Sequence, residues 1–127
     1  MKTLLIGIDS YGRMKERSLQ IARGKMKPKR GEPKVWFTSI ESFSRVLSDS
    51  NRDLLKLIHE HQPESLQELA DLSSREKSNL SRTLKTMNRY GLVDLEQGPR
   101  GRLIPRFPYS NIKLDLNISS EGMRNHH

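Results

Sequence analysis

The sequence predicts an α+β fold, with a helical core followed by a β-hairpin and preceded by an N-terminal arm of one strand and one helix. Between residues 39 and 90, apolar residues recur at the three- and four-residue spacing of helices. From Val93 onward they alternate with polar residues, as in half-buried strands. The chain has 127 residues, of which 33% are hydrophobic, so we expect one small core.

The N-terminal arm is expected to span residues 1–34. Residues 3–8 (TLLIGI) form a short apolar strand, and residues 10–24 a helix from Ser10 to Gly24. Residues 25–34 combine prolines and a glycine with many basic residues, which is typical of a linker. Residues 11–34 hold nine Lys or Arg against two Glu, so most of the net charge of +8 lies in this arm. It is a candidate DNA-contacting arm, a segment that orders on a partner, or a solubilising tail.

The domain itself is expected at residues 35–118, beginning with a short strand at residues 35–37. Helices follow at residues 39–48, 51–61, 65–73 and 74–90. A Ser or Thr followed three residues later by Glu is a capping box, and this pattern occurs at Thr38, Ser65 and Ser73. Gly91 is suited to end the last helix in a left-handed conformation.

Strands are predicted after the last helix. Residues 92–96 and 103–107 form a hairpin around a turn at residues 98–102, and Pro105 indicates an edge strand. Residues 111–118 alternate most clearly. This last strand can close the sheet within one subunit, pair with a second subunit, or pair with residues 3–8. Residues 119–127 are expected to form a disordered tail.

The predicted helix at residues 74–90 has one apolar face and one basic face. Leu80, Leu84 and Met87 follow the spacing of a single helix face. After Glu76 the helix carries Lys and Arg but no acidic residue. A solvated helix ordinarily mixes both signs, because opposite charges four residues apart stabilise it. Together with a pI of about 10.0, the one-signed face favours a polyanionic partner.

Several classes of protein are disfavoured by composition. The chain has no Cys, which excludes disulfides, thiolate metal sites and cysteine nucleophiles. The apolar run at the N-terminus is too short for a signal peptide or a membrane span, so we expect a cytoplasmic protein without a membrane partner. His59 and His61 point to different helix faces, and no phosphate loop or paired acid and base is found. We therefore expect no enzyme, no metal site and no cofactor.

The order of helices, tight turn, longer helix and hairpin is that of a winged helix-turn-helix, which predicts double-stranded DNA as the partner. The basic helix is expected to enter the major groove, with Ser78, Asn79 and Arg82 reading base edges. Other candidate DNA contacts go to phosphates or the minor groove. They are Arg75, Lys77, Lys85 and Arg89 on the same helix, Ser65 and Gln67 at the start of the preceding helix, and Arg100 and Arg102 at the hairpin tip.

The segment SLQELADLSSREKSNLSRTLKTMNRYGLVDLE resembles the core of MarR-like winged helix-turn-helix transcriptional regulators. The segments IARGKMKPKRGEPKVWFTSIESFSRVLS and NIKLDL are similar to a set of small prokaryotic DNA-binding proteins with a short N-terminal arm. Some of those proteins act as antitoxins. Such proteins often have Gly in the turn before the recognition helix, where this chain has Ser73 and Ser74.

These observations favour a sequence-specific transcriptional regulator that acts as a repressor. Such regulators usually bind as homodimers on two-fold sites, so we expect a homodimer. Two alternatives remain open. The first is an antitoxin that binds a toxin protein and represses its own operon. The second is a winged helix that binds protein or RNA, because a fold does not fix a function.

Overall fold

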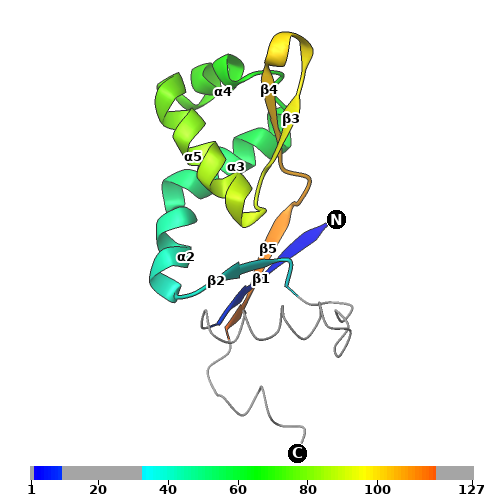
Figure 1. Cartoon of the computed structure of the whole chain (residues 1–127). Coiled ribbons are helices and arrows are strands. Elements are labelled where there is room, and N and C mark those ends of the chain that lie inside the picture. The colour runs from blue at the N-terminus through cyan, green and yellow to red at the C-terminus, as the bar shows by residue number, and fades with distance from the viewer. Residues whose placement is uncertain (1, 10–32, 117–127) are drawn as a thin grey trace, which may run out of the picture. The chain divides into compact units, whose positions relative to one another are not determined.

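The computed structural model describes residues 2–9 and 33–116, which form an α+β structure (Figure 1). The chain divides into two compact units, which are Met1–Lys2 with Ser44–Ser110, and Thr3–Phe43 with Asn111–His127. The predicted helix at residues 10–24, most of the linker and the tail at residues 119–127 lie outside the described residues. None of the described helices is long and apolar enough to cross a bilayer.

A parallel three-stranded sheet lies in the second of these units. Its order is β2-β1-β5, where β1 is Thr3–Ile8, β2 is Val35–Phe37 and β5 is Asn111–Leu116. The strand predicted at residues 3–8 is confirmed with the same bounds, and Figure 1 shows it between its two partners. Of the three pairings considered for the last strand, the structure has the one with residues 3–8.

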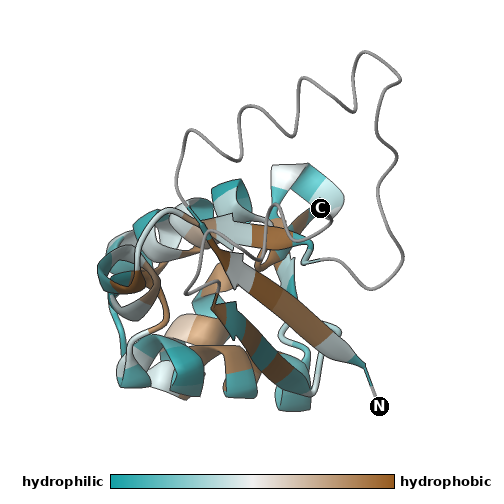
Figure 2. Cartoon of the chain, turned by 90° about the horizontal axis from the view of Figure 1, so that it is seen from below, coloured by the Kyte–Doolittle hydropathy of each residue, from teal (hydrophilic) through white to brown (hydrophobic). Residues whose placement is uncertain are grey.

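The centre of this sheet is apolar, as expected for a parallel sheet that is covered on its faces. Leu4, Ile6 and Ile8 of β1 are at most 5% exposed, and β1 is hydrophobic along most of its length (Figure 2). On β2, Val35 and Phe37 are equally buried beside them. The sequence predicts a domain boundary between residues 34 and 35. In the structure that position lies inside this unit, because β1, which precedes it, pairs with β2, which follows it.

Helix α2 (Ile40–Val46) follows β2 directly. Its cap is Ser39, whose hydroxyl accepts a hydrogen bond from the amide of Ser42 at 3.1 Å. The capping box predicted at Thr38 is therefore wrong by one residue. Both residues carry a hydroxyl that can cap a helix, but the chain enters the helix only after Ser39.

The other unit contains α3 (Asp49–His61), α4 (Leu66–Ser73) and α5 (Lys77–Tyr90), followed by the hairpin β3 (Asp94–Gln97) and β4 (Leu103–Arg106) (Figure 1). Helix α3 begins two residues earlier than predicted, because Ser48 caps it by accepting from the amide of Asn51 at 3.2 Å. Each helix buries one apolar face. The buried residues of the three helices are Leu54, Leu55, Ile58, Leu66, Leu69, Ala70, Leu80, Leu84 and Met87.

The hairpin is shorter than the sequence predicts. Leu92 and Val93 belong to the core rather than to a strand, and β3 begins at Asp94. The predicted turn at residues 98–102 is confirmed and contains a short 3-10 segment, Pro99–Gly101. Pro105 lies in β4 opposite Leu95, in a sheet of two strands where every strand is an edge.

Candidate functional site

The turn between α4 and α5 determines where α5 begins. Ser74 adopts a left-handed conformation with φ of 60°, and the amides of Ser74 and Arg75 both donate to the carbonyl of Ala70. This arrangement closes α4 in the way a C-terminal glycine ordinarily does. Ser74 thus takes, in the turn before α5, a conformation that Gly adopts more readily than a residue with a side chain.

The capping box predicted at Ser73 is wrong. Ser73 is the last residue of α4, and its hydroxyl donates to the carbonyl of Ala70 at 3.5 Å. Helix α5 begins at Lys77, three residues later than expected, after an extended Glu76 whose side chain makes no capping hydrogen bond. Consequently Ser78 and Asn79 lie in the first turn of α5, where both are exposed.

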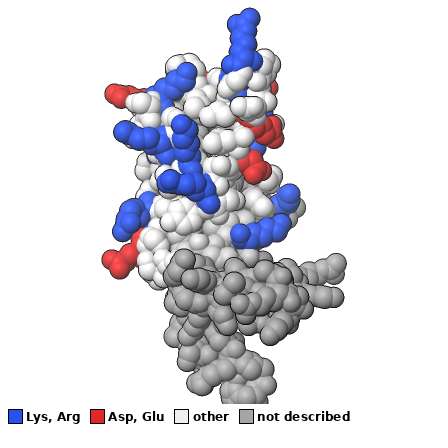
Figure 3. All heavy atoms as spheres, viewed as in Figure 1, with Lys and Arg blue, Asp and Glu red and all other residues white. Residues whose placement is uncertain are grey.

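Helix α5 separates apolar from basic residues as the sequence predicts. Leu80, Leu84 and Met87 are at most 1% exposed and hold the helix against the core. The basic residues of the helix, namely Lys77, Arg82, Lys85 and Arg89, are all exposed. Figure 3 shows Lys and Arg side chains gathered over this helix. The surface of α5 therefore presents positive charge without an acidic residue between Lys77 and Tyr90.

The protein itself binds the guanidinium groups of two predicted phosphate-binding residues, Arg75 and Arg89. Arg89 donates to the hydroxyl of Thr86 at 3.2 Å within α5, whereas Arg75 reaches a different helix. Arg75 donates to the carbonyl of Ser50 at 3.0 Å and to the hydroxyl of Ser50. These hydrogen bonds connect the α4–α5 turn to the first turn of α3. Arg75 thus positions the start of α5.

The start of α4 carries two further predicted residues. The hydroxyl of Ser65 accepts from the amide of Glu68 at 3.1 Å, which confirms the predicted cap. Its own proton remains available to a ligand, since a hydroxyl both donates and accepts. Gln67 is exposed and donates to Asp71 at 3.1 Å along the same helix.

The hairpin tip presents Arg100 and Arg102, both of them exposed. The amide of Gly98 donates to the carbonyl of Arg102 at 2.6 Å and closes the turn, while Arg100 is left-handed with φ of 61°. The space-filling view shows basic side chains reaching the tip of the hairpin (Figure 3).

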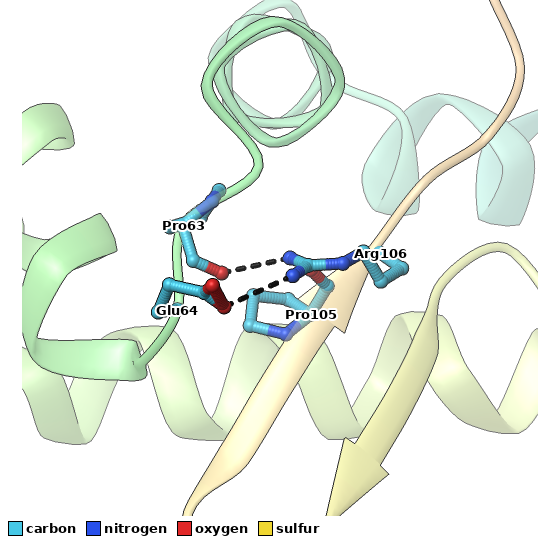
Figure 4. A network of polar contacts seen from close by, with 4 residues as sticks. All are labelled: Pro63, Glu64, Pro105 and Arg106. Carbon is cyan, nitrogen blue, oxygen red and sulfur yellow. Dashed lines mark hydrogen bonds and ion pairs between the residues drawn. The ribbon is translucent and has the colours of Figure 1, made fainter. Parts of the chain in front are cut away.

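The base of the hairpin is fixed to the segment between α3 and α4, a feature that the sequence analysis missed. Arg106 donates to the carbonyl of Pro63 at 2.8 Å and to the carboxylate of Glu64 at 3.2 Å (Figure 4). Nearby, Nδ1 of His59 donates to the carbonyl of Phe107 at 3.0 Å, because a carbonyl can only accept. These contacts hold the hairpin in one orientation relative to the helices.

Two comparisons with known proteins found nothing and one found a family. A family model described as HVO_A0114 matches residues 46–114, which is more than half of the chain. No curated protein and no solved structure matches this chain. The matched range covers all three helices of the first unit, the hairpin, and part of β5.

Proposed function

We propose that this chain, which belongs to the HVO_A0114 family, binds double-stranded DNA as a winged helix-turn-helix protein and regulates transcription. The order of elements supports the proposal. Helices α4 and α5 are joined by a turn of three residues, and a two-stranded hairpin follows directly. In this interpretation α5 is the recognition helix and the β3–β4 hairpin is the wing. Under this proposal the chain resembles MarR-like regulators in function as well as in sequence pattern.

The observation that carries the proposal is the exposed, one-signed face of α5. With 14 residues, α5 is about 21 Å long, and the width of an α-helix fits a major groove that is about 12 Å wide. A cationic surface of this kind gains free energy on DNA because it releases counterions from the phosphates. A solvated helix would gain more from acidic residues placed among the basic ones.

The first turns of α5 supply the groups that discriminate between bases. Arg82 can donate two hydrogen bonds to guanine, and Asn79 can pair with the edge of adenine. Both side chains are exposed near the N-terminal end of α5, which is the end that contacts bases in helix-turn-helix proteins. Lys77, Lys85 and Arg89 flank them and are assigned to phosphates.

The wing and α4 add contacts that position the protein on the duplex. Arg100 and Arg102 at the hairpin tip are assigned to the backbone or the minor groove. The hydrogen bonds of Arg106 to Pro63 and Glu64 fix the wing, so these contacts cost less conformational entropy on binding. Ser65 and Gln67 are assigned to a phosphate at the N-terminus of α4.

A repressor requires no catalysis, since a protein that occupies a promoter excludes the transcription machinery. We therefore assign the chain a regulatory and non-enzymatic role. An antitoxin would use the same DNA surface and would in addition bind a toxin protein. An RNA-binding or protein-binding winged helix would use the basic face of α5 without an operator.

The test is selection of bound fragments from the genomic DNA of the host by the purified full-length chain. Enrichment of one sequence supports a regulator, and a toxin-like reading frame beside the enriched site supports the antitoxin role. A variant with both Arg82→Ala and Lys85→Ala, compared with the exposed control Lys56→Ala on α3, tests whether α5 makes the contacts. Absence of enrichment, together with preferential binding of structured RNA or of neither nucleic acid, would refute DNA regulation.

A further inference from the structure

The outer edge of β5 is an exposed surface that contains none of the residues assigned to DNA. Strand β5 pairs with β1 on one side, and no strand among the described residues pairs with its other side. Leu114 and Leu116 on this strand are 42% and 43% exposed, two of the four large apolar side chains exposed in the described residues. An open strand edge with exposed leucines is a site for pairing with another chain.

The apolar face of the sheet continues onto β5 but is not fully covered there. Ile112, Leu114 and Leu116 lie beside Leu4, Ile6 and Ile8 of β1 and point to the same face, because registered residues of adjacent strands share a side. The β1 residues are at most 5% exposed, whereas the two leucines of β5 remain more than 40% exposed. One more strand at this edge would cover them.

The opposite face of β5 carries one charge of each sign. Lys113 and Asp115 are both exposed and lie on the same side of the strand, two residues apart. Neither takes part in an ion pair with another described residue. Leu114 lies midway between them. The sequence around Leu114 is therefore symmetric. Lys113 and Asp115 carry opposite charges on its two sides, and the next residues outward, Ile112 and Leu116, are both apolar.

We propose that a second copy of this chain pairs with β5, in an antiparallel register centred on Leu114. In this register Leu114 faces Leu114 of the copy across the two-fold axis, and Ile112 faces Leu116. Lys113 faces Asp115, and by symmetry this ion pair forms twice. The two three-stranded sheets become one sheet of six strands, with the apolar face continuous across the axis.

Other registers lose either the two ion pairs or the continuous apolar face. Centring the pair on Lys113 or Asp115 places identical charges opposite each other, which destabilises cross-strand pairs. A shift by one residue opposes leucines to charged side chains and breaks the apolar face. The complementarity of β5 with itself therefore selects both the partner and the register. The inference does not depend on DNA binding, although a two-fold dimer would present two α5 helices to an inverted repeat.

The test is a charge swap measured by sedimentation velocity over a concentration series, with the full-length chain and without DNA. Lys113→Asp and Asp115→Lys each place two like-charged pairs in the dimer, so each should weaken self-association by about tenfold or more. The double variant K113D/D115K restores opposite charges and should dimerise as the natural chain does. A mixture of the two single variants should form a heterodimer, since every charge in it then faces its opposite.

Circular dichroism melting of each variant alone shows whether the fold is retained. Both substituted positions are exposed, so each variant should still melt cooperatively, with any shift of the midpoint limited to the loss of dimerisation. The proposal is wrong if the natural chain stays monomeric at every concentration, if the single variants associate as well as it does, or if mixing them produces no added association. If a single variant unfolds, the double variant K113D/D115K is the test, and the proposal is wrong if that variant folds but does not dimerise. Because the assay contains no DNA, a negative result leaves the proposed DNA-binding function standing.

Discussion

Replacing Lys85 with alanine should reduce the salt dependence of DNA binding without loss of folding. The side chain of Lys85 is exposed on the outer face of α5, so its removal leaves the apolar packing of Leu84 and Met87 intact. A lysine that neutralises one phosphate contributes about 0.9 to the slope of log affinity against log salt concentration. The variant should therefore weaken binding to every sequence by a similar factor.

The expected magnitude follows from the number of exposed cations assigned to phosphates. These are Lys77, Lys85 and Arg89 on α5 with Arg100 and Arg102 on the wing. One phosphate for each gives a slope of about −4.5 per chain, so a change from about 50 to about 200 mM salt weakens binding about 500-fold. Without Lys85 the slope becomes about −3.6, and the same change in salt weakens binding about 150-fold.

Fluorescence anisotropy of a labelled duplex, titrated with protein at several salt concentrations, measures both slopes. Lys56→Ala is the matched control, because Lys56 is an exposed lysine on α3 of the same unit. Its slope should equal that of the natural chain. An unchanged slope for Lys85→Ala, or an equal reduction for Lys56→Ala, would refute the assignment of Lys85 to a phosphate.

Arg82→Ala should cost about 1–3 kcal/mol of specific binding and relax the preference at one base pair, as measured by selection from a randomised duplex; unchanged preference would contradict the base contact. Ser74→Gly should raise the free energy of unfolding by about 1 kcal/mol in urea denaturation, because a left-handed residue with a side chain is strained. A decrease would show that the Ser74 side chain itself stabilises the turn. Gly7→Ala should lower the free energy of unfolding by about 1–3 kcal/mol, since a new Cβ would lie 2.5 Å from the ring of Trp36. Trp36 is the only tryptophan in the chain, so its fluorescence reports this change, and an unshifted transition would contradict the clash.

Short sequence patterns predicted the structure correctly where a single short-range interaction determines it. The cap at Ser65 and the left-handed glycine at Gly91 are confirmed, because each depends on hydrogen bonds within a few residues. The exposed cations and buried leucines of α5 are likewise confirmed, since a helix with period 3.6 fixes which residues share a face.

The same local pattern failed at Ser73, where two structures compete for one sequence. A serine three residues before a glutamate fits the start of a helix, but Ser73 here ends α4 instead. The observed structure is accompanied by contacts that are distant in sequence, including the hydrogen bonds from Arg75 to Ser50. Contacts between distant residues also fix the wing through Arg106 and pair β1 with β5, and no short sequence pattern specifies them.

The placement of β1 has a consequence for how the chain folds during its synthesis. Strand β1 leaves the ribosome well before its long neighbour β5, because residues 9–110 separate the two strands. The sheet therefore cannot close until residues 111–116 have been synthesised, whereas residues 44–110 can assemble their own core beforehand. Until then β1 is an apolar segment without its main partner, and this nascent stage is the one at which aggregation or capture by a chaperone is expected.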